Sequence, residues 1–331
     1  MRRLFAMGLF AQSLFSLTEV YAQSKIATIE SRKTIVVAVI DTGIDVEHPQ
    51  LKNCIFQNKG ELGFDSKGRD KRFNNIDDDG NGYVDDYEGW NFVDESNNIA
   101  DNLGHGTHIA GIIAGTTNKY KRVLASQSLI KILPIKFYDI SASNSINFTQ
   151  TTVKAINYAI DMKVDVINYS GGGMVSDFRE RQAIERANSR GILFVAAAGN
   201  DAKNIDRARF YPASYNLPNI ISVGALAGNN LPLRLSNYGS KNVDLSAPGS
   251  DIQSTVPGGK VGKMTGTSQA TAFVTAAATM LRALLDKTIS PEKIKLHLMK
   301  NSNFLPSLKG MNRSDGALNA LKALRSSQAL L

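Results

Sequence analysis

Two side chains of the sequence have the types and surroundings expected of an acid–base pair. Asp41 directly follows the apolar stretch 35–40, and in parallel sheets the functional crevice lies at the carboxyl ends of the strands. His105 stands between two glycines just before an apolar segment. Glycines allow the backbone to turn sharply and to approach closely, so His105 is the best candidate for a general base among the four histidines.

Two further side chains could supply a nucleophile and an oxyanion donor. Ser268 opens an alanine-rich helical segment. There its Oγ could attack a carbonyl carbon while its own backbone N–H, at the positive end of the helix dipole, stabilises an oxyanion. Asn200 closes an apolar strand segment and could donate its side-chain amide to the same oxyanion.

Three of these residues also fit a purely structural role. Asp41 could cap a turn, Ser268 could be a helix N-cap, and Asn200 could be a turn residue. Their joint occurrence in the order Asp, His, Asn, Ser favours catalysis. This order differs from those of chymotrypsin and the α/β-hydrolases, and the hydrolase elbow G-x-S-x-G fails because Ala270 replaces its second glycine.

The segments that must position these residues alternate between strand and helix patterns. Continuous apolar runs rich in β-branched residues predict strands at 35–40, 129–135, 164–169, 191–198 and 220–225. Helical patterns predict helices at 109–114, 151–162, 178–189, 269–285 and 291–299. The alternation predicts an α/β fold with a doubly wound, mostly parallel sheet and helices on both faces.

Length and composition limit the class of protein. The chain has 331 residues, of which 43% are hydrophobic and 21% charged, and this excludes a disordered chain, a collagen and a polytopic membrane protein. A single cysteine, Cys54, excludes an intrachain disulfide and a cysteine-based metal site. The net charge of +8 is spread out without a nucleic-acid motif, so we expect a solubilising surface charge and no nucleic-acid partner.

The first 22 residues have the pattern of a secretory signal peptide. Arg2 and Arg3 precede an apolar stretch, and Ala22 ends a short segment suited to a signal peptidase. A buried amphipathic helix is the alternative. We therefore expect residues 23–331 to form a single domain that is secreted, extracellular or periplasmic. We also expect the mature chain to be monomeric and to have no membrane association.

The motifs around the four residues resemble those of subtilisin-like serine proteases, the subtilase family. The resemblance runs from about residue 35 to about residue 324, and its motifs are residues 39–43, 104–111, 166–172, 196–200, 211–213, 236–239, 245–249 and 266–268. It implies that Asp41 orients His105, that His105 is the base, that Ser268 is the nucleophile and that Asn200 is the oxyanion donor.

The resemblance also implies a substrate-binding surface. One segment, Ser170, Gly171 and Gly172, would pair with the substrate backbone as an added strand. A second, Ala197, Ala198 and Gly199, would border the pocket for the residue before the cleaved bond. Small residues in both segments would equally allow strand and helix to pack closely.

Some positions depart from the family pattern. Gln269, Ala272 and Phe273 stand where most subtilases have Met, Pro and His. None of the three is a catalytic group, so we still expect activity, with altered packing behind Ser268. The resemblance further implies a cis peptide bond between Tyr211 and Pro212.

An acidic insertion at about 74–90 has the spacing of a calcium loop. Residues 77–88 fit the pattern D-x-D-x-[DN]-G-x5-E. The spacing predicts a structural Ca²⁺ site formed by Asp77, Asp79, Asn81, Tyr83, Asp85 and Glu88. The alternative is a solvated acidic loop.

These patterns predict a secreted serine endopeptidase that acts on polypeptide substrates. A non-catalytic binding protein on a subtilase scaffold is one alternative, and the intact set of four catalytic residues argues against it. A serine esterase is the other, and the missing hydrolase elbow argues against it.

Overall fold

The computed structural model describes residues 33–124, 126, 128–140 and 148–330. The predicted signal peptide at 1–22 lies outside the described residues. Among the helices that the model describes, none has the length and apolar character needed to cross a membrane.

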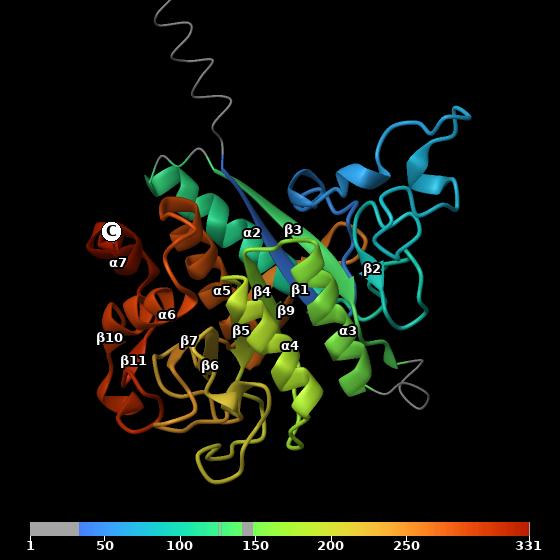
Figure 1. The fold of residues 1–331 in the computed structure, drawn as a ribbon. Coiled ribbons are helices and arrows are strands. Elements are labelled where there is room, and N and C mark those ends of the chain that lie inside the picture. Colours follow the sequence, from blue (N-terminus) through green and yellow to red (C-terminus); the bar gives the residue numbers. More distant parts are fainter. Residues whose placement is uncertain (1–32, 125, 127, 141–147, 331) are drawn as a thin grey trace, which may run out of the picture.

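A nine-stranded sheet forms the centre of the fold (Figure 1). Its strands are β1 (Thr34–Asp41), β2 (Trp90–Asn91), β3 (Leu129–Lys136), β4 (Val166–Tyr169), β5 (Leu193–Ala197), β6 (Ile220–Leu226), β7 (Leu245–Pro248), β10 (Asn303–Phe304) and β11 (Gly316–Ala317). Their order across the sheet is β10-β11-β7-β6-β5-β4-β1-β3-β2. All neighbouring pairs are parallel except β10 and β11.

Strand β1, which lies between β4 and β3, explains why the sheet is covered on both faces. Every residue of this strand after Thr34 is buried. Because successive side chains point to opposite faces, Ile35, Val37 and Val39 join one apolar core and Val36, Ala38 and Ile40 join the other. Such a strand requires helices on both sides.

Helices supply the two covering layers. On one face lie α2 (His105–Leu124), α5 (Thr267–Leu284), α6 (Pro291–Lys300) and α7 (Ala320–Arg325). On the other lie α3 (Phe148–Asp161) and α4 (Phe178–Ser189), as Figure 1 shows. Helix α5 is buried along nearly its whole length, which accounts for its many alanine and threonine residues. The expected doubly wound α/β fold is therefore confirmed.

The sequence patterns identified the long elements and missed several short ones. All five predicted strands and all five predicted helices are present. Most ends differ by a few residues, but the helix predicted at 109–114 is much longer and spans His105–Leu124. The hairpin β8 (Ile252–Val256) and β9 (Lys260–Met264) was not predicted because most of its residues are exposed or half-buried and lack a continuous apolar run. Strands β2, β7, β10 and β11 were missed because each has four residues or fewer.

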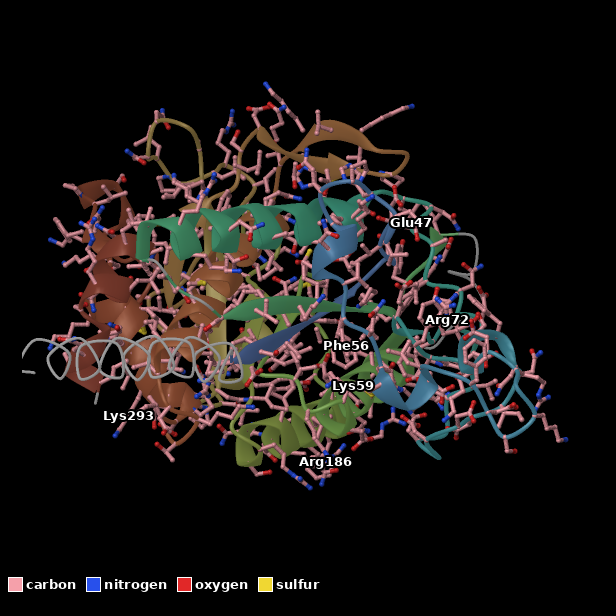
Figure 2. The ribbon with its side chains drawn as sticks, turned by 90° about the horizontal axis from the view of Figure 1, so that it is seen from above. Glu47, Phe56, Lys59, Arg72, Arg186 and Lys293 are labelled. Atoms are coloured by element: carbon pink, nitrogen blue, oxygen red, sulfur yellow. The ribbon has the colours of Figure 1, made fainter. Side chains whose placement is uncertain are left out.

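An insertion between β1 and α2 contains little regular structure. It includes the 3₁₀ helices η1 (Lys52–Cys54), η2 (Lys59–Glu61) and η3 (Lys71–Phe73), and it ends at β2. Figure 2 shows Arg72 on this insertion and Lys293 on α6 at opposite ends of the molecule. The insertion therefore extends the edge of the sheet on the side of β3 and β2.

Candidate active site

Asp41 and His105 form a close pair at the carboxyl end of β1. The distance from His105 Nδ1 to Asp41 Oδ1 is 2.6 Å. The Asp41 side chain is 3% exposed and the His105 side chain 31% exposed, so the carboxylate is desolvated while the imidazole remains accessible. Gly106 permits this approach, because a Cβ at that position would collide with the carbonyl oxygen of Gly43.

Asp101 fixes the start of the helix that carries His105. Its Oδ1 accepts hydrogen bonds from the Thr42 hydroxyl and the Gly104 backbone N–H, both at 2.8 Å. Its Oδ2 accepts the backbone N–H and the hydroxyl of Thr107. This buried carboxylate therefore joins the end of β1 to the first turn of α2. Sequence reasoning missed Asp101, although its place a few residues before an apolar helix was a capping signal.

The surroundings of His105 alter its pKa. Burial lowers the pKa, but the charge and hydrogen bond of Asp41, together with the charge of Asp101, outweigh burial and raise it above the ordinary value of 6.5. By contrast, burial lowers the pKa of His108, whose ring contacts the carbonyl oxygen of Ile252 at 2.9 Å. His108 is thus a packed side chain for which the neutral form is favoured.

Ser268 lies in the first turn of α5, where the backbone N–H groups have no intrahelical acceptor. Its Oγ donates to the carbonyl oxygen of Ser170 at 3.4 Å. Ser170 and His105 line the same cavity, so Ser268 contacts a residue of the wall that His105 shares. Gln269, next to Ser268, is 1% exposed and lies beside Gly266.

Asn200 follows β5 and lies beside the start of α5. Its Oδ1 accepts the backbone N–H of Thr267 at 2.9 Å and the Thr267 hydroxyl at 3.0 Å. A backbone N–H can only donate, so the atom that faces Thr267 is the oxygen of the amide. Both Oδ1 and Nδ2 lie near Gly266 at the start of the helix. Asn200 is exposed, and its amide is available as a donor.

A cavity of about 450 Å³ opens beside Asp41 and His105. Five of its lining residues are large and apolar or aromatic: Leu103, Phe137, Tyr138, Phe148 and Tyr169. The predicted substrate segment Ser170, Gly171 and Gly172 forms another of its walls. Ser170 is held in place because Asn168 donates to its hydroxyl at 3.1 Å and accepts from Thr275 of α5 at 2.7 Å.

The second predicted substrate segment, Ala197, Ala198 and Gly199, lies across from the first, and the ring of Phe210 lies between them. A Cβ on Gly172 would collide with this ring, and a Cβ on Gly199 would lie 3.0 Å from it. Phe210 therefore fills space that two glycines leave open. Sequence reasoning missed it, because nothing near position 210 marks a contact with residues 172 and 199.

The acidic loop has a geometry that its spacing did not predict. Asp77 uses Oδ1 to accept the N–H groups of Gly80 and Asn81 and uses Oδ2 to accept the N–H of Gly82. Asn81 Oδ1 accepts the N–H of Tyr83 at 2.8 Å. Much of the polar sequence therefore forms turns within the loop.

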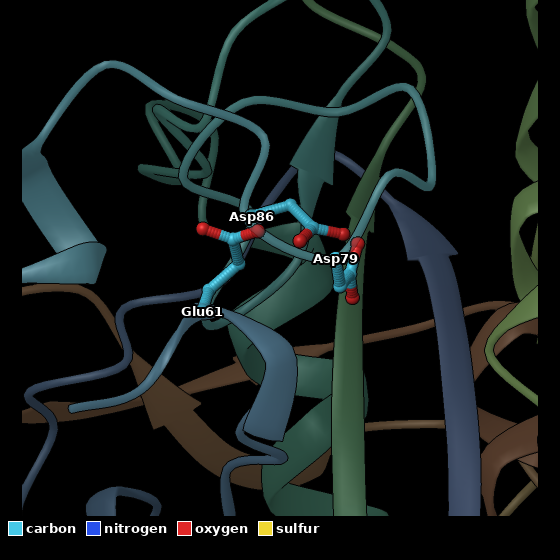
Figure 3. A group of neighbouring side chains, drawn as sticks. All are labelled: Glu61, Asp79 and Asp86. Atoms are coloured by element: carbon cyan, nitrogen blue, oxygen red, sulfur yellow. The ribbon is translucent and has the colours of Figure 1, made fainter. Parts of the chain in front are cut away.

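Asp79 and Glu88, two members of the predicted calcium set, line different cavities. Asp79 lines one cavity with Asn81 and Tyr83, whereas Glu88 lines another near Glu47. Asp85 Oδ2 accepts the N–H of Asn75 at 3.1 Å. Among the described residues, Asp79 lies with Glu61 and Asp86, neither of which belongs to the predicted set (Figure 3).

The peptide bond between Tyr211 and Pro212 is cis, and this confirms the expectation that the family resemblance gave.

Known proteins are similar to this chain over most of its length. The model of the subtilase family matches residues 32–321. The chain is 35% identical to the major intracellular serine protease of Bacillus subtilis (strain 168) over 255 residues, which are 76% of this chain and 69% of that protein. It is 38% identical to the cell wall-associated protease of the same organism over 75% of this chain and 23% of that protein. It is 32% identical to subtilisin NAT of Bacillus subtilis subsp. natto over 82% of this chain and 62% of that protein.

Solved structures share the fold. A lanthipeptide protease superposes with a TM-score of 0.66 at 22% identity, covering 88% of this chain and 87% of that chain. A cold-adapted subtilisin-like serine proteinase superposes with a TM-score of 0.61 at 24% identity, covering 86% of each chain. The family model spans most of the chain, and the major intracellular serine protease, at 35% identity, is matched over more than two thirds of its length. The chain therefore belongs to the subtilase family of serine peptidases.

Proposed function

We propose that this chain is a serine endopeptidase in which Ser268 is the nucleophile, His105 the general base and Asp41 the group that orients His105. The observation that carries the proposal is the 2.6 Å pair of His105 and Asp41, which borders the same cleft as Ser170, the hydrogen-bond partner of Ser268. A base held by a buried carboxylate beside a helix-terminal serine is suited to nucleophilic catalysis.

The reaction follows from these positions. The Ser268 hydroxyl turns from Ser170 toward His105, gives its proton to the imidazole, and its Oγ bonds to the carbonyl carbon of the peptide. The oxyanion is met by the Ser268 backbone N–H and Asn200 Nδ2. His105 then gives the proton to the leaving nitrogen, and the C–N bond breaks. Water, deprotonated by His105, attacks the acyl-enzyme and releases the acid and the free Ser268 hydroxyl.

The cleft favours a polypeptide over a small ester. Ser170, Gly171 and Gly172 follow β4 and are half-buried or exposed, so their backbone groups are accessible to an extended chain. Leu103 and the aromatic side chains of the 450 Å³ cavity would bind apolar side chains on the acyl side of the cleaved bond. We also propose that Phe210 restricts the residue immediately before that bond to small side chains.

Export is part of the proposal. The basic and apolar pattern of residues 2–22 supports a cleaved signal peptide. Relatives named as intracellular and as cell wall-associated are both found. Expression in a bacterial host with N-terminal sequencing of the mature protein tests this point. Retention of residues 1–22 in a cytoplasmic product would contradict export.

One experiment tests the catalytic proposal against its alternatives. Purified protein is treated with a fluorophosphonate probe and then assayed on an unfolded protein and on a simple ester, with Ser268→Ala as the control. We expect labelling and proteolysis that are both lost in Ser268→Ala. Labelling with ester hydrolysis alone would indicate an esterase, and absence of labelling would indicate a binding protein.

A further inference from the structure

A second cavity lies at the opposite end of the strands from the cleft described above. Asp165, which lines this cavity, directly precedes β4, whereas Ser170, which lines the cleft, directly follows it. The cavity has a volume of about 200 Å³. The C-terminal parts of α3, α4 and α5 meet around it, because Ile160, Arg190 and Arg282 are among its lining residues.

Basic side chains dominate the lining of this cavity. Four lining residues are basic and one is acidic: Lys163, Arg190, Arg282, Lys287 and Asp165. Lys163 also borders the cavity of Asp161, but without it the positive charges still exceed the single carboxylate by two. Like charges gathered in this way repel one another, and a bound anion would relieve that repulsion.

Arg282 is the buried member of this basic group. It is 2% exposed, and its Nη1 and Nη2 donate to the carbonyl oxygens of Ile289 and Gly191, each at 2.6 Å. Burial lowers the pKa of Arg282, and the charge of Asp165 opposes this effect only in part. Because a guanidinium stays protonated in proteins and has five N–H donors, Arg282 provides a desolvated positive charge at the cavity wall.

Basic side chains near helix C-termini also stabilise the helix carbonyl groups. Arg282 acts in this way, and so does Lys33, which donates to two carbonyl oxygens near the end of α5. Lys287 instead pairs with Asp165 at 3.1 Å. In the part of the chain that the structure describes, no carboxylate or carbonyl accepts from the Arg190 side chain. Helix stabilisation therefore accounts for only part of the basic group.

We propose that this cavity binds a small oxyanion of the phosphate class, held by Arg190, Arg282 and Lys287. A tetrahedral oxyanion presents several oxygens, and a guanidinium can donate to two of them with parallel N–H groups. A volume of about 200 Å³ leaves room for one small anion and not for a nucleic-acid strand or a peptide. The site does not depend on the proposed catalytic function.

The anion would join the two faces of the sheet. Arg190 directly follows α4, which covers one face, and Arg282 lies in α5, which covers the other. Lys287 lies between α5 and α6. A ligand that binds only the folded state stabilises it by mass action. Phosphate should therefore raise stability without altering the chemistry at the far end of the strands.

The test is phosphate binding to the full chain carrying Ser268→Ala, which prevents self-digestion. Sodium phosphate in the low millimolar range is titrated by calorimetry, and the melting temperature is compared with that in sodium chloride of equal ionic strength, which screens charges equally. The variants are Arg190→Gln and Lys287→Gln, both at exposed positions. Arg181→Gln is the matched control, since Arg181 lies on α4 away from the cavity and pairs with Glu185 at 2.9 Å.

We expect one phosphate to bind and to raise the melting temperature above the sodium chloride reference. Arg190→Gln and Lys287→Gln should each weaken binding by about tenfold, the loss expected for one hydrogen bond to a charged group. Arg181→Gln should change the dissociation constant by less than about twofold. Absence of saturable binding to the parent, or unchanged binding in both cavity variants, would overturn the proposal. An equal loss in Arg181→Gln would also overturn it, because phosphate would then respond to net charge alone.

Discussion

Thr267 holds the Asn200 side chain by two hydrogen bonds to the same oxygen, one from its backbone N–H at 2.9 Å and one from its hydroxyl at 3.0 Å. Thr267 is also the residue before Ser268 in the first turn of α5. The proposed amide donor and the proposed nucleophile are therefore positioned by the same helix terminus. A shift of that terminus would move both groups together.

Replacing Asn200 with Ala should lower kcat by on the order of 10² to 10³, the loss known from removing an oxyanion donor in subtilisin. The KM should change little, because the donor bonds most strongly to the transition state. Steady-state kinetics on a peptide substrate measure both. An effect confined to KM would instead assign Asn200 to substrate binding.

Thr267→Val should cause a smaller loss, because it removes the hydroxyl and leaves the backbone N–H to hold Asn200. A neutral hydrogen bond contributes about 1 kcal/mol, so we expect a reduction of kcat of roughly fivefold. In Thr267→Val combined with Asn200→Ala, the loss should equal that of Asn200→Ala alone. Additive losses would show that Thr267 acts by another route.

The pKa of His105 predicts the pH profile. His105 must be neutral to accept the Ser268 proton, and Asp41 and Asp101 raise its pKa above 6.5 despite burial. The acidic limb of kcat/KM should therefore lie above pH 6.5 and lead to an alkaline plateau. Measurement of kcat/KM between pH 4 and 10 checks this, and an acidic optimum would exclude a histidine base.

The raised pKa of His105 also affects folding stability. Activity should rise with pH, whereas the contribution of His105 to stability should fall. A folded-state pKa above the unfolded value means that protonated His105 favours the folded state. This contribution is fully present below the unfolded pKa and is lost as the pH rises through the folded pKa. The active form of His105 is thus the less stabilising one.

Phe210→Ala should change which residue is accepted before the cleaved bond. The ring of Phe210 lies against Gly172 and Gly199, so its removal opens space between the two substrate segments. Burying an aromatic side chain there would contribute about 1.5–3 kcal/mol, so the kcat/KM ratio of a phenylalanine substrate to an alanine substrate should rise by roughly 10- to 100-fold.

Phe148→Ala is the control for this change. Phe148 lines the cavity on the other side of Ser170 to Gly172, so its loss should affect residues further from the cleaved bond. If the kcat/KM ratio of the phenylalanine substrate to the alanine substrate were the same in wild type and Phe210→Ala, Phe210 would not limit this position.

Glu180→Gln should remove a pH dependence of folding stability. Burial, opposed in part by the hydrogen bond from Tyr215, raises the pKa of Glu180 from 4.5 to about 7. The protonated form therefore favours the folded state below pH 4.5, and this contribution, roughly 3 kcal/mol, is lost as the pH rises to about 7. In denaturant unfolding of Ser268→Ala protein, Glu180→Gln should be more stable at pH 8 and unchanged at pH 4.5.

Glu185→Gln provides the comparison on the same helix. Glu185 is exposed and pairs with Arg181 at 2.9 Å, and surface pairs of this kind contribute little. Its replacement should leave the pH dependence as in the parent. A Glu180→Gln variant that follows the parent at every pH would contradict the burial argument.

The candidate catalytic positions stand out in the sequence because each has a local signature. Asp41 ends an apolar strand, His105 stands between glycines before a helix, and Ser268 starts one. A carboxylate at a strand end, a histidine and a serine at helix starts together indicate nucleophilic catalysis by serine. The structure adds Asp101, whose role depends on contacts with Thr42 and Thr107 that spacing alone does not reveal.

The acidic insertion shows where sequence reasoning reaches its limit. The spacing from Asp77 to Glu88 matches a known loop pattern, and in the fold Asp77 accepts the backbone N–H groups of Gly80 and Gly82. Glu61, which lies well before the motif, approaches Asp79. A short-range pattern cannot show which distant carboxylate the folded backbone brings near, and the same holds for Phe210 and its two glycines.

The pairing of β1 has a consequence for how the chain folds. Thr34 pairs with Leu129 and Val37 pairs with Val166, so the first strand of the sheet gains its neighbours only when segments far along the chain have been made and collapsed. Contacts so distant in sequence close large loops and slow the search for the native state. Until β3 and β4 arrive, β1 is an apolar segment with free edges, the kind of segment that aggregates. We therefore expect refolding to be slow and yield to fall with protein concentration.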